Sequence, residues 1–209
     1  MSKIDFRVDN REINRYFTAL SGYLTHTAVT NASGAPIEMS EAINQCMANA
    51  RRAHAEGNKL IFVGNGGSAA IASHMATDYS KNGGVRSLAM NDGSMLTCLG
   101  NDLGYDQVFA KQLELHARAG DLVIAISSSG RSANILNAVK AARAAGCSVI
   151  TLSGFGADNP LRRLGDINFY LASDRYGFVE IGHLTICHAI LDFICGLRVP
   201  DSMVLAPAT

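Results

Sequence analysis

Residues 121–132 read DLVIAISSSGRS, an apolar run that ends in a serine-rich loop. The apolar part is the most strand-like stretch of the chain, and residues 133–145 after the loop have the spacing of a helix. The same order occurs earlier, where LIFV at 60–63 leads into GNGGS at 64–68 and then into a second helix. Continuous apolar strands that alternate with helices predict a parallel sheet covered by helices on both faces, which is an α/β fold.

The remaining segments extend this alternation. We predict the second helix to end near residue 82, further strands at 86–90, 148–152 and 167–171, and further helices at 94–99, 105–119 and 179–197. Two more helices, at 11–31 and 40–54, precede the first strand and have no evident partner. We therefore divide the chain into an N-terminal helical oligomerisation arm (1–57), an α/β domain (58–200) and a C-terminal tail (201–209).

The composition and net charge limit the classes of function that this chain can have. The 209 residues are 48% hydrophobic and 17% charged, which is enough apolar surface for a sizeable core. Lys+Arg and Asp+Glu both number 18, so the net charge of +0 argues against general binding to nucleic acid or to an anionic membrane. No apolar run approaches the roughly 20 residues of a membrane span, and the charged N-terminus has no signal-peptide core.

The number and spacing of the cysteines indicate a reducing cellular compartment. The five residues are odd in number and contain no CxxC pair: Cys46, Cys98, Cys147, Cys187 and Cys195. We expect buried free thiols in a reducing, cytoplasmic environment. The low charge also suggests that part of the surface is buried between subunits.

Both loops have the chemistry of an anion site. Ligands of open α/β sheets bind beyond the carboxyl ends of the strands. Glycines at 64–67 let backbone N–H groups approach an anion at a helix N-terminus, and Ser68 adds a hydroxyl. Residues 127–132 offer four serine hydroxyls at the start of another helix. Together the loops predict a phosphate site, although each alone is also compatible with a simple turn or helix cap.

A dinucleotide site is the alternative for the first loop. Gly64, Gly66 and Ala69 fit the relaxed GxGxxG/A pattern, and Asp92 follows the next strand. That fingerprint needs only one glycine-rich loop, however, and it leaves the serine loop without a role. No GxxxxGK[ST] pattern is present.

Four ionisable residues lie on two helices. His74 and Asp78 are four residues apart and share a face, and Glu180 and His188 are about 80° apart around the last helix, with His183 between them in sequence. If the helices meet, these groups can form either a general acid/base set or a metal site with N/O ligands. The other histidines have ordinary amphipathic surroundings: His26, His54 and His116.

Several short motifs occur together. GNGGS is followed by a helix with AxH, then GND at 100–102, then ISxSGxSxN at 126–134. This combination resembles sugar isomerase (SIS) domains, and among them the bacterial phosphoheptose isomerases, which convert sedoheptulose 7-phosphate into D-glycero-D-manno-heptose 7-phosphate. The resemblance extends over nearly the whole chain, including the arm and the last helix.

The resemblance implies a flavodoxin-like parallel sheet and a homotetramer with sites at subunit interfaces. It implies sugar-phosphate binding by Asn65, Gly66, Gly67, Ser68, Asn101, Asp102, Ser127, Ser128, Ser129, Ser132 and Glu180. The family's catalytic positions match Asp78, Glu180 and His188. Its metal positions match His74, Asp78, Glu180 and His188, so Zn²⁺ is the expected cofactor.

Three positions depart from the family pattern. Asp78 stands where glutamate is usual, Glu180 where glutamine is usual, and Gly177 where aspartate is often found. Aspartate retracts its carboxylate by one methylene, and catalytic positioning tolerates little error. The carboxylate of Glu180 could replace the base or strengthen a zinc site, so the choice of base stays open here.

We expect a cytoplasmic aldose–ketose isomerase that supplies heptose for lipopolysaccharide, capsule or another surface glycan. One alternative is a non-catalytic relative, like the one that binds the replication initiator DnaA, but His74 and His188 favour the enzyme. Another is a sugar-phosphate-sensing SIS module, but the chain has no basic helical domain for DNA. No nucleic-acid or membrane partner is expected.

Overall fold

The sheet is built from strands that end at the two predicted loops. Within residues 7–204, which the computed structural model describes, the strands are β1 (Ala28–Asn31), β2 (Leu60–Gly64), β3 (Ser87–Ala89), β4 (Leu122–Ser127), β5 (Ser148–Ser153) and β6 (Ile167–Tyr170). They lie in the order β1-β6-β5-β4-β2-β3, and every neighbouring pair is parallel except β1 with β6. The order of the parallel strands is that of a flavodoxin-like, doubly wound sheet.

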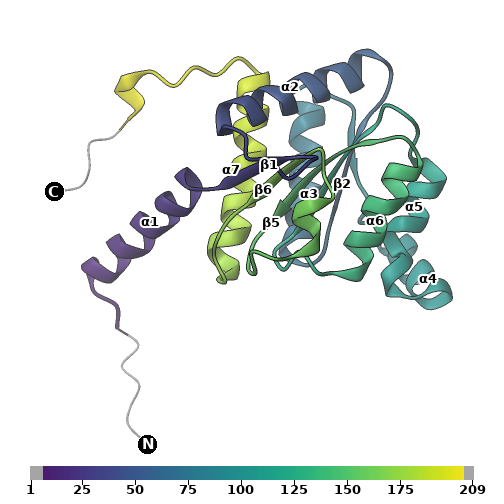
Figure 1. Ribbon diagram of the computed structural model, residues 1–209, viewed down its shortest axis with the longest axis horizontal. Coiled ribbons are helices and arrows are strands. Elements are labelled where there is room, and N and C mark those ends of the chain that lie inside the picture. The colour runs from purple at the N-terminus through teal and green to yellow at the C-terminus, as the bar shows by residue number, and fades with distance from the viewer. Residues whose placement is uncertain (1–6, 205–209) are drawn as a thin grey trace, which may run out of the picture.

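Helices connect the strands and cover both faces of the sheet (Figure 1). They are α1 (Asn10–Thr25), α2 (Met39–Ala55), α3 (Gly67–Lys81), α4 (Gly93–Leu103), α5 (Val108–His116), α6 (Ala133–Ala144) and α7 (Tyr176–Ile194), with 3₁₀ turns at Tyr105–Gln107, Pro160–Arg163 and Asp201–Met203. The predicted α/β architecture is confirmed.

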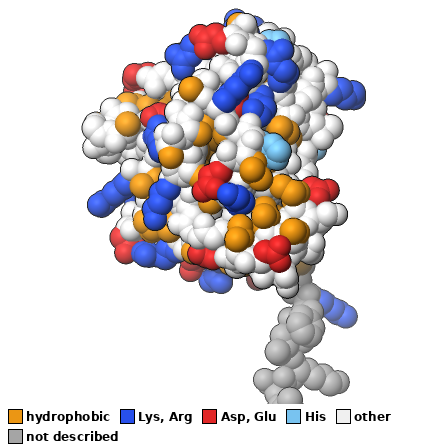
Figure 2. Space-filling view, turned by 90° about the vertical axis from the view of Figure 1, so that its right-hand side faces the viewer, with side chains coloured by type: hydrophobic (Ala, Val, Ile, Leu, Met, Phe, Trp, Pro, Cys, Tyr) orange, Lys and Arg blue, Asp and Glu red, His pale blue; other side chains and the backbone are white. Residues whose placement is uncertain are grey.

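Two cores lie on opposite sides of the sheet. Side chains alternate along each strand, so Phe62 joins the core with α2, α3 and α7, whereas its neighbour Ile61 joins the core with α5 and α6. Both cores are apolar, which explains why the central strands are continuous hydrophobic runs. On the outer face at the α4–α6 end of the molecule, basic and acidic side chains are interspersed, in keeping with the net charge of +0 (Figure 2).

The predicted helix at 11–31 is wrong in its last six residues. The helix ends at Thr25, and β1 follows and pairs with β6. The reason is local: Thr27, Val29 and Thr30 are β-branched and favour extended backbone. The side chain of Asn31 then accepts hydrogen bonds from the backbone of residues 33 and 35, which turns the chain.

The N-terminal segment divides into two different parts. α2 buries Ala42, Ile43, Cys46, Ala50 and Ala53 in the sheet core, so residues 28–55 share one packed unit with residues 58–200. α1 has no buried residue and projects from this unit (Figure 1). It contacts α7 through Tyr16 and Tyr23, whose rings lie 4.6 and 5.2 Å from the ring of Phe178. Residues 1–6 of the arm and 205–209 of the tail are outside the described residues.

The expectation that no apolar run approaches the length of a membrane span is wrong for α7. Its 19 residues are long and apolar enough to cross a membrane by length and composition alone. They instead form a core helix, because Val179, Ile186 and Ile190 pack among the buried residues of the sheet unit. The sequence estimate missed this because Glu180 and the histidines interrupt the run.

All five cysteines are free, as predicted. Cys46, Cys147 and Cys187 are buried, and burial raises the pKa of the Cys187 thiol to about 12. The prediction of burial is wrong for Cys98 and Cys195, which are exposed. Each lies on or next to a helix that has a solvent-facing side. Apolar neighbours in the sequence do not determine whether a residue of such a helix faces the core or the solvent.

Candidate active site

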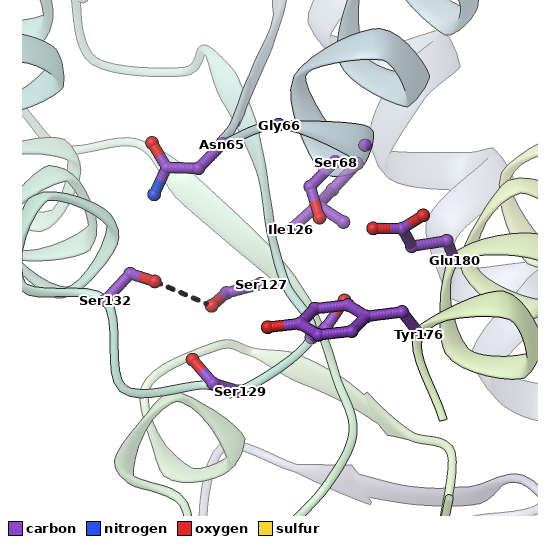
Figure 3. A pocket seen from close by; sticks show the side chains of 11 residues that line it. Asn65, Gly66, Ser68, Ile126, Ser127, Ser129, Ser132, Tyr176 and Glu180 are labelled. Carbon is purple, nitrogen blue, oxygen red and sulfur yellow. Dashed lines mark hydrogen bonds between the residues drawn. The ribbon is translucent and has the colours of Figure 1, made fainter. Parts of the chain in front are cut away.

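A cavity of about 250 Å³ opens at the carboxyl ends of β2 and β4. The chain runs from β2 to β3 on one side and then returns to β4 on the other side of β2, so this is the topological switch point where such sheets bind ligands. The cavity is lined by Asn65, Gly66, Gly67, Ser68, Ile126, Ser127, Ser128, Ser129, Ser132, Tyr176 and Glu180 (Figure 3). The two predicted loops therefore form one site.

The serine loop presents several hydroxyl groups to this cavity. The Oγ atoms of Ser127 and Ser132 lie 3.3 Å apart, and the amide of Gly130 donates to Ser127 Oγ over 3.2 Å. Ser132 is the N-cap residue of α6, yet its side chain makes no cap hydrogen bond. Within the described residues, the buried Oγ of Ser128 has no hydrogen-bond partner. Unused buried donors of this kind suit the acceptor oxygens of a phosphate group.

The glycine loop has little room for side chains. Gly66 adopts φ +54 as the N-cap of α3, a left-handed conformation that glycine tolerates best. A Cβ on Gly67 would lie 2.4 Å from the carboxyl group of Glu180. The loop therefore brings the backbone at the start of α3 directly against the carboxylate from α7.

A polar network that the sequence analysis missed holds Asn65. The side-chain amides of Asn65 and Asn134 exchange two hydrogen bonds of 2.9 and 2.8 Å. The hydroxyl of Tyr105 also donates to Asn65 Oδ1, over 3.1 Å. Asn134 is the last residue of the ISxSGxSxN motif, so its motif position was a usable signal. Nothing in the sequence pattern marked Tyr105.

A second group of site residues lies further along α3 and α7. His74 Nε2 is 3.3 Å from His188 Nε2 and 3.5 Å from Asp78 Oδ2. Ligands at 2.0–2.2 Å from a tetrahedral ion are roughly 3.3–3.6 Å from each other. One potential ligand atom from each of the three residues lies within 4.8 Å of the others. The donor set and its spacing therefore fit a divalent metal such as zinc.

Glu180 is not part of that group of three. Glu180 is eight residues from His188, and helix rise places the two about 12 Å apart along α7. The two residues lie on similar sides of the helix, but they are more than two turns apart along its axis. The carboxyl group of Glu180 instead lies against Gly67 in the cavity. The predicted role of Glu180 as a fourth metal ligand stays a prediction.

His183 faces the protein interior. It is fully buried, and Nε2 lies 3.1 Å from the carbonyl oxygen of Ser153 at the end of β5. Desolvation lowers the pKa of His183 to about 4, so the ring is neutral at pH 7 and its Nε2–H donates to that carbonyl. His183 is therefore a structural link between α7 and the sheet.

Comparisons with known proteins agree with this geometry. The SIS domain family matches residues 26–154. A phosphoheptose isomerase of Citrifermentans bemidjiense is 36% identical over 163 residues, which cover 75% of this chain and 84% of the relative. A phosphoheptose isomerase of Aliarcobacter butzleri is 41% identical over 144 residues, covering 66% and 76%. The chain belongs to the phosphoheptose isomerase family.

Solved structures extend the likeness to nearly the full length. The phosphoheptose isomerase of Neisseria gonorrhoeae has a TM-score of 0.76 at 30% identity and covers 90% of this chain and 98% of its own. That of Francisella tularensis has a TM-score of 0.75 at 27% identity and covers 91% and 100%. The structural likeness therefore extends beyond the matched SIS segment.

Two residues that family resemblance assigns to the substrate do not line the cavity of the single chain. Asn101 and Asp102 lie on the last turn of α4, and both are exposed. The side-chain amide of Asn101 donates to Asp102 Oδ1 over 2.7 Å. Their role in binding stays a prediction.

Proposed function

We propose that this family member catalyses the aldose–ketose isomerisation of sedoheptulose 7-phosphate to D-glycero-D-manno-heptose 7-phosphate. The observation that carries the proposal is the arrangement along α3 and α7. The cavity with the donor-rich loops lies at the start of α3 and beside the first turns of α7, and the group His74, Asp78 and His188 lies about two turns further along these two helices. This arrangement suits an extended sugar that is held by its phosphate at one end and reacts at the other.

The serine loop binds the phosphate in this proposal. The hydroxyls of Ser127, Ser129 and Ser132, together with the unpartnered Oγ of Ser128, donate to the phosphate oxygens. The amides at the start of α6 add the favourable field of a helix N-terminus. A charged substrate is thereby held without a charged side chain lining the serine side of the cavity.

The ionisable groups move protons. A carboxylate removes the proton from the carbon next to the carbonyl group, which gives an enediol, and the carboxylic acid so formed returns a proton to the neighbouring carbon. Asp78 lies beside two imidazoles, whereas Glu180 lies against the glycine loop. We propose Asp78 as the base, Glu180 as a substrate ligand, and His188 as the group that transfers the proton between the two sugar oxygens.

The three clustered residues fit a metal ion. His74, Asp78 and His188 would hold a divalent ion, most simply Zn²⁺, which would supply Lewis-acid chemistry to the sugar carbonyl. We also propose that the protein works as a cytoplasmic homotetramer and that its product enters the assembly of a surface glycan.

Turnover of sedoheptulose 7-phosphate tests the proposal, with formation of the aldose product as the readout. We expect activity in the wild-type chain and a rise in KM of at least about a hundredfold when Ser129→Ala and Ser132→Ala are combined, because each lost bond to a charged group contributes roughly 1.5–3 kcal/mol. The exposed Ser202→Ala is the control. A metal-loaded wild-type protein that binds sugar phosphate without turnover would favour the non-catalytic alternative.

A further inference from the structure

Phe155 has an unusual backbone for its side chain. Its φ is +56, and among the described residues it is the sole non-glycine residue with positive φ. Two hydrogen bonds hold it there: its amide donates to the carbonyl of Ser173 over 2.9 Å, and the hydroxyl of Tyr170 donates to its carbonyl over 2.7 Å. Such conformations persist where the surroundings impose them, and they concentrate at functional sites.

The effect of this conformation is to place an aromatic ring beside the cavity. The ring of Phe155 meets the ring of Tyr176 edge-on, with centroids 4.9 Å apart and planes at 75°. Tyr176 opens α7 and lines the cavity, yet it is 62% exposed. Burial of Tyr176 therefore does not explain why the chain holds Phe155 against it.

Figure 3 shows where Tyr176 points. Its ring lies across the cavity in front of the loops, and the hydroxyl end is directed toward the side that carries Ser127 and Ser129. The serine hydroxyls and the glycine loop also line this cavity. A phosphate held there has further acceptor oxygens, and the phenol hydroxyl of Tyr176 is another donor among the lining residues.

We propose that Tyr176 is a further substrate-binding residue, whose hydroxyl donates a hydrogen bond to the phosphate group in the serine loop. Phe155 is a positioning residue that holds the tyrosine ring over the cavity. This inference rests on the proposed function, since it takes the serine loop as the phosphate site.

Binding of inorganic phosphate, measured by calorimetry, tests Tyr176 separately from turnover. We expect Tyr176→Phe to raise the Kd for phosphate and the KM for the sugar phosphate roughly tenfold, with kcat little changed, because one bond to an anion is lost while the ring remains. Tyr23→Phe is the matched control, since that ring also packs on α7 but lies at Phe178, away from the lining residues. Unchanged phosphate affinity in Tyr176→Phe would overturn the inference.

Phe155→Gly tests the positioning role. Glycine accepts the positive φ, so we expect the Tm to stay near that of the wild type while phosphate affinity falls. In a Tyr176→Ala background the same change should have no further effect, because Phe155 acts through the tyrosine. An equal loss of affinity in both backgrounds would overturn that role. The results distinguish failure of this inference from failure of the proposed function. If the wild-type chain binds phosphate and turns over the sugar phosphate, and Tyr176→Phe does both equally well, the inference alone is refuted. If the wild-type chain neither binds phosphate nor turns over the sugar phosphate, both proposals are refuted.

Discussion

At the scale of single residues, surroundings decide which ionisable groups can react. His74 is exposed and His183 is fully buried, although both lie on helices of the site. Burial makes His183 a neutral donor to the Ser153 carbonyl, while His74 and His188 keep ring nitrogens that face each other. Residue type alone therefore does not separate a structural histidine from a candidate ligand.

The buried histidine predicts a pH dependence of stability. The folded-state pKa of His183 is about 4, below the ordinary value of 6.5, so the unfolded chain takes up the proton first as the pH falls. Its neutral form supports stability above pH 6.5, and this contribution is lost between pH 6.5 and 4, by roughly 3 kcal/mol. Urea unfolding at pH 7.5 and 4.5 measures it. His183→Gln should lose less stability over this range, and an equal loss in both proteins would contradict the assignment.

The metal cluster predicts a stoichiometry. Elemental analysis of the purified protein should find about one divalent ion, most simply zinc, per chain, because the spacing of the three ligand atoms fits a tetrahedral site. His188→Ala should lose both the metal and turnover, and chelation should abolish wild-type activity until zinc is added back. An active preparation without metal, indifferent to chelator, would leave His188 as an acid/base group only.

The two carboxylates predict different kinetic effects. Asp78→Asn should lower kcat by about 10²–10⁴-fold, which is the usual contribution of a general base. Glu180→Gln keeps the shape and hydrogen-bonding capacity of the side chain in the cavity, so we expect mainly a change in KM. Pre-steady-state exchange of the substrate proton with solvent measures the base step directly. Loss of exchange in Glu180→Gln, with exchange retained in Asp78→Asn, would reverse the two roles.

At the scale of elements, close approaches between backbone segments shape the serine loop. Gly130 has φ +60, and a Cβ on it would lie 2.0 Å from Asn159 Oδ1. Asn159 is fully buried, and its amide donates to the carbonyl oxygens of Gly154 and Gly156 over 3.1 and 2.9 Å. The loop after β5 therefore packs against the loop after β4 at Gly130.

This contact predicts a difference between two glycine substitutions. Gly130→Ala and Gly34→Ala both place alanine at positive φ, which costs roughly 1–2 kcal/mol. At Gly34 no atom lies within 4 Å of the new Cβ, whereas at Gly130 the alanine also meets Asn159. Gly130→Ala should therefore lower the free energy of unfolding more and raise the KM for the sugar phosphate. If Gly130→Ala and Gly34→Ala lower the free energy of unfolding equally and leave KM unchanged, the contact with Asn159 does not shape the serine loop.

At the scale of the whole molecule, α1 stands apart from the packed unit. It has no buried residue, and Ile13, Tyr16 and Phe17 are between 40% and 61% exposed. A 16-residue helix is marginal by itself in water, and an apolar face of this kind ordinarily packs on another surface. A second copy of the chain is the expected surface, in agreement with the proposed homotetramer.

Light scattering tests that assembly. We expect a mass about four times that of the 22.2 kDa chain at micromolar concentration. Ile13→Glu combined with Phe17→Glu should lower the mass, since burial of these side chains drives the association. The matched control Ser21→Glu changes the charge at another exposed position of α1. A stable wild-type monomer would contradict the proposed tetramer.

The sequence alone determined the α/β class, the two phosphate-type loops and the residues that could act as ligands. These features are local, because strand and helix periods, glycine turns and serine clusters depend on neighbours in the chain. Tertiary structure decided what depends on distant segments: β1 as an antiparallel edge, α2 as a core helix, and the network of Asn65 with Asn134 and Tyr105. The rise of about 12 Å between Glu180 and His188 follows from the sequence numbers, but only the packing of α3 against α7 placed His188 with His74 and Asp78 and placed Glu180 against Gly67.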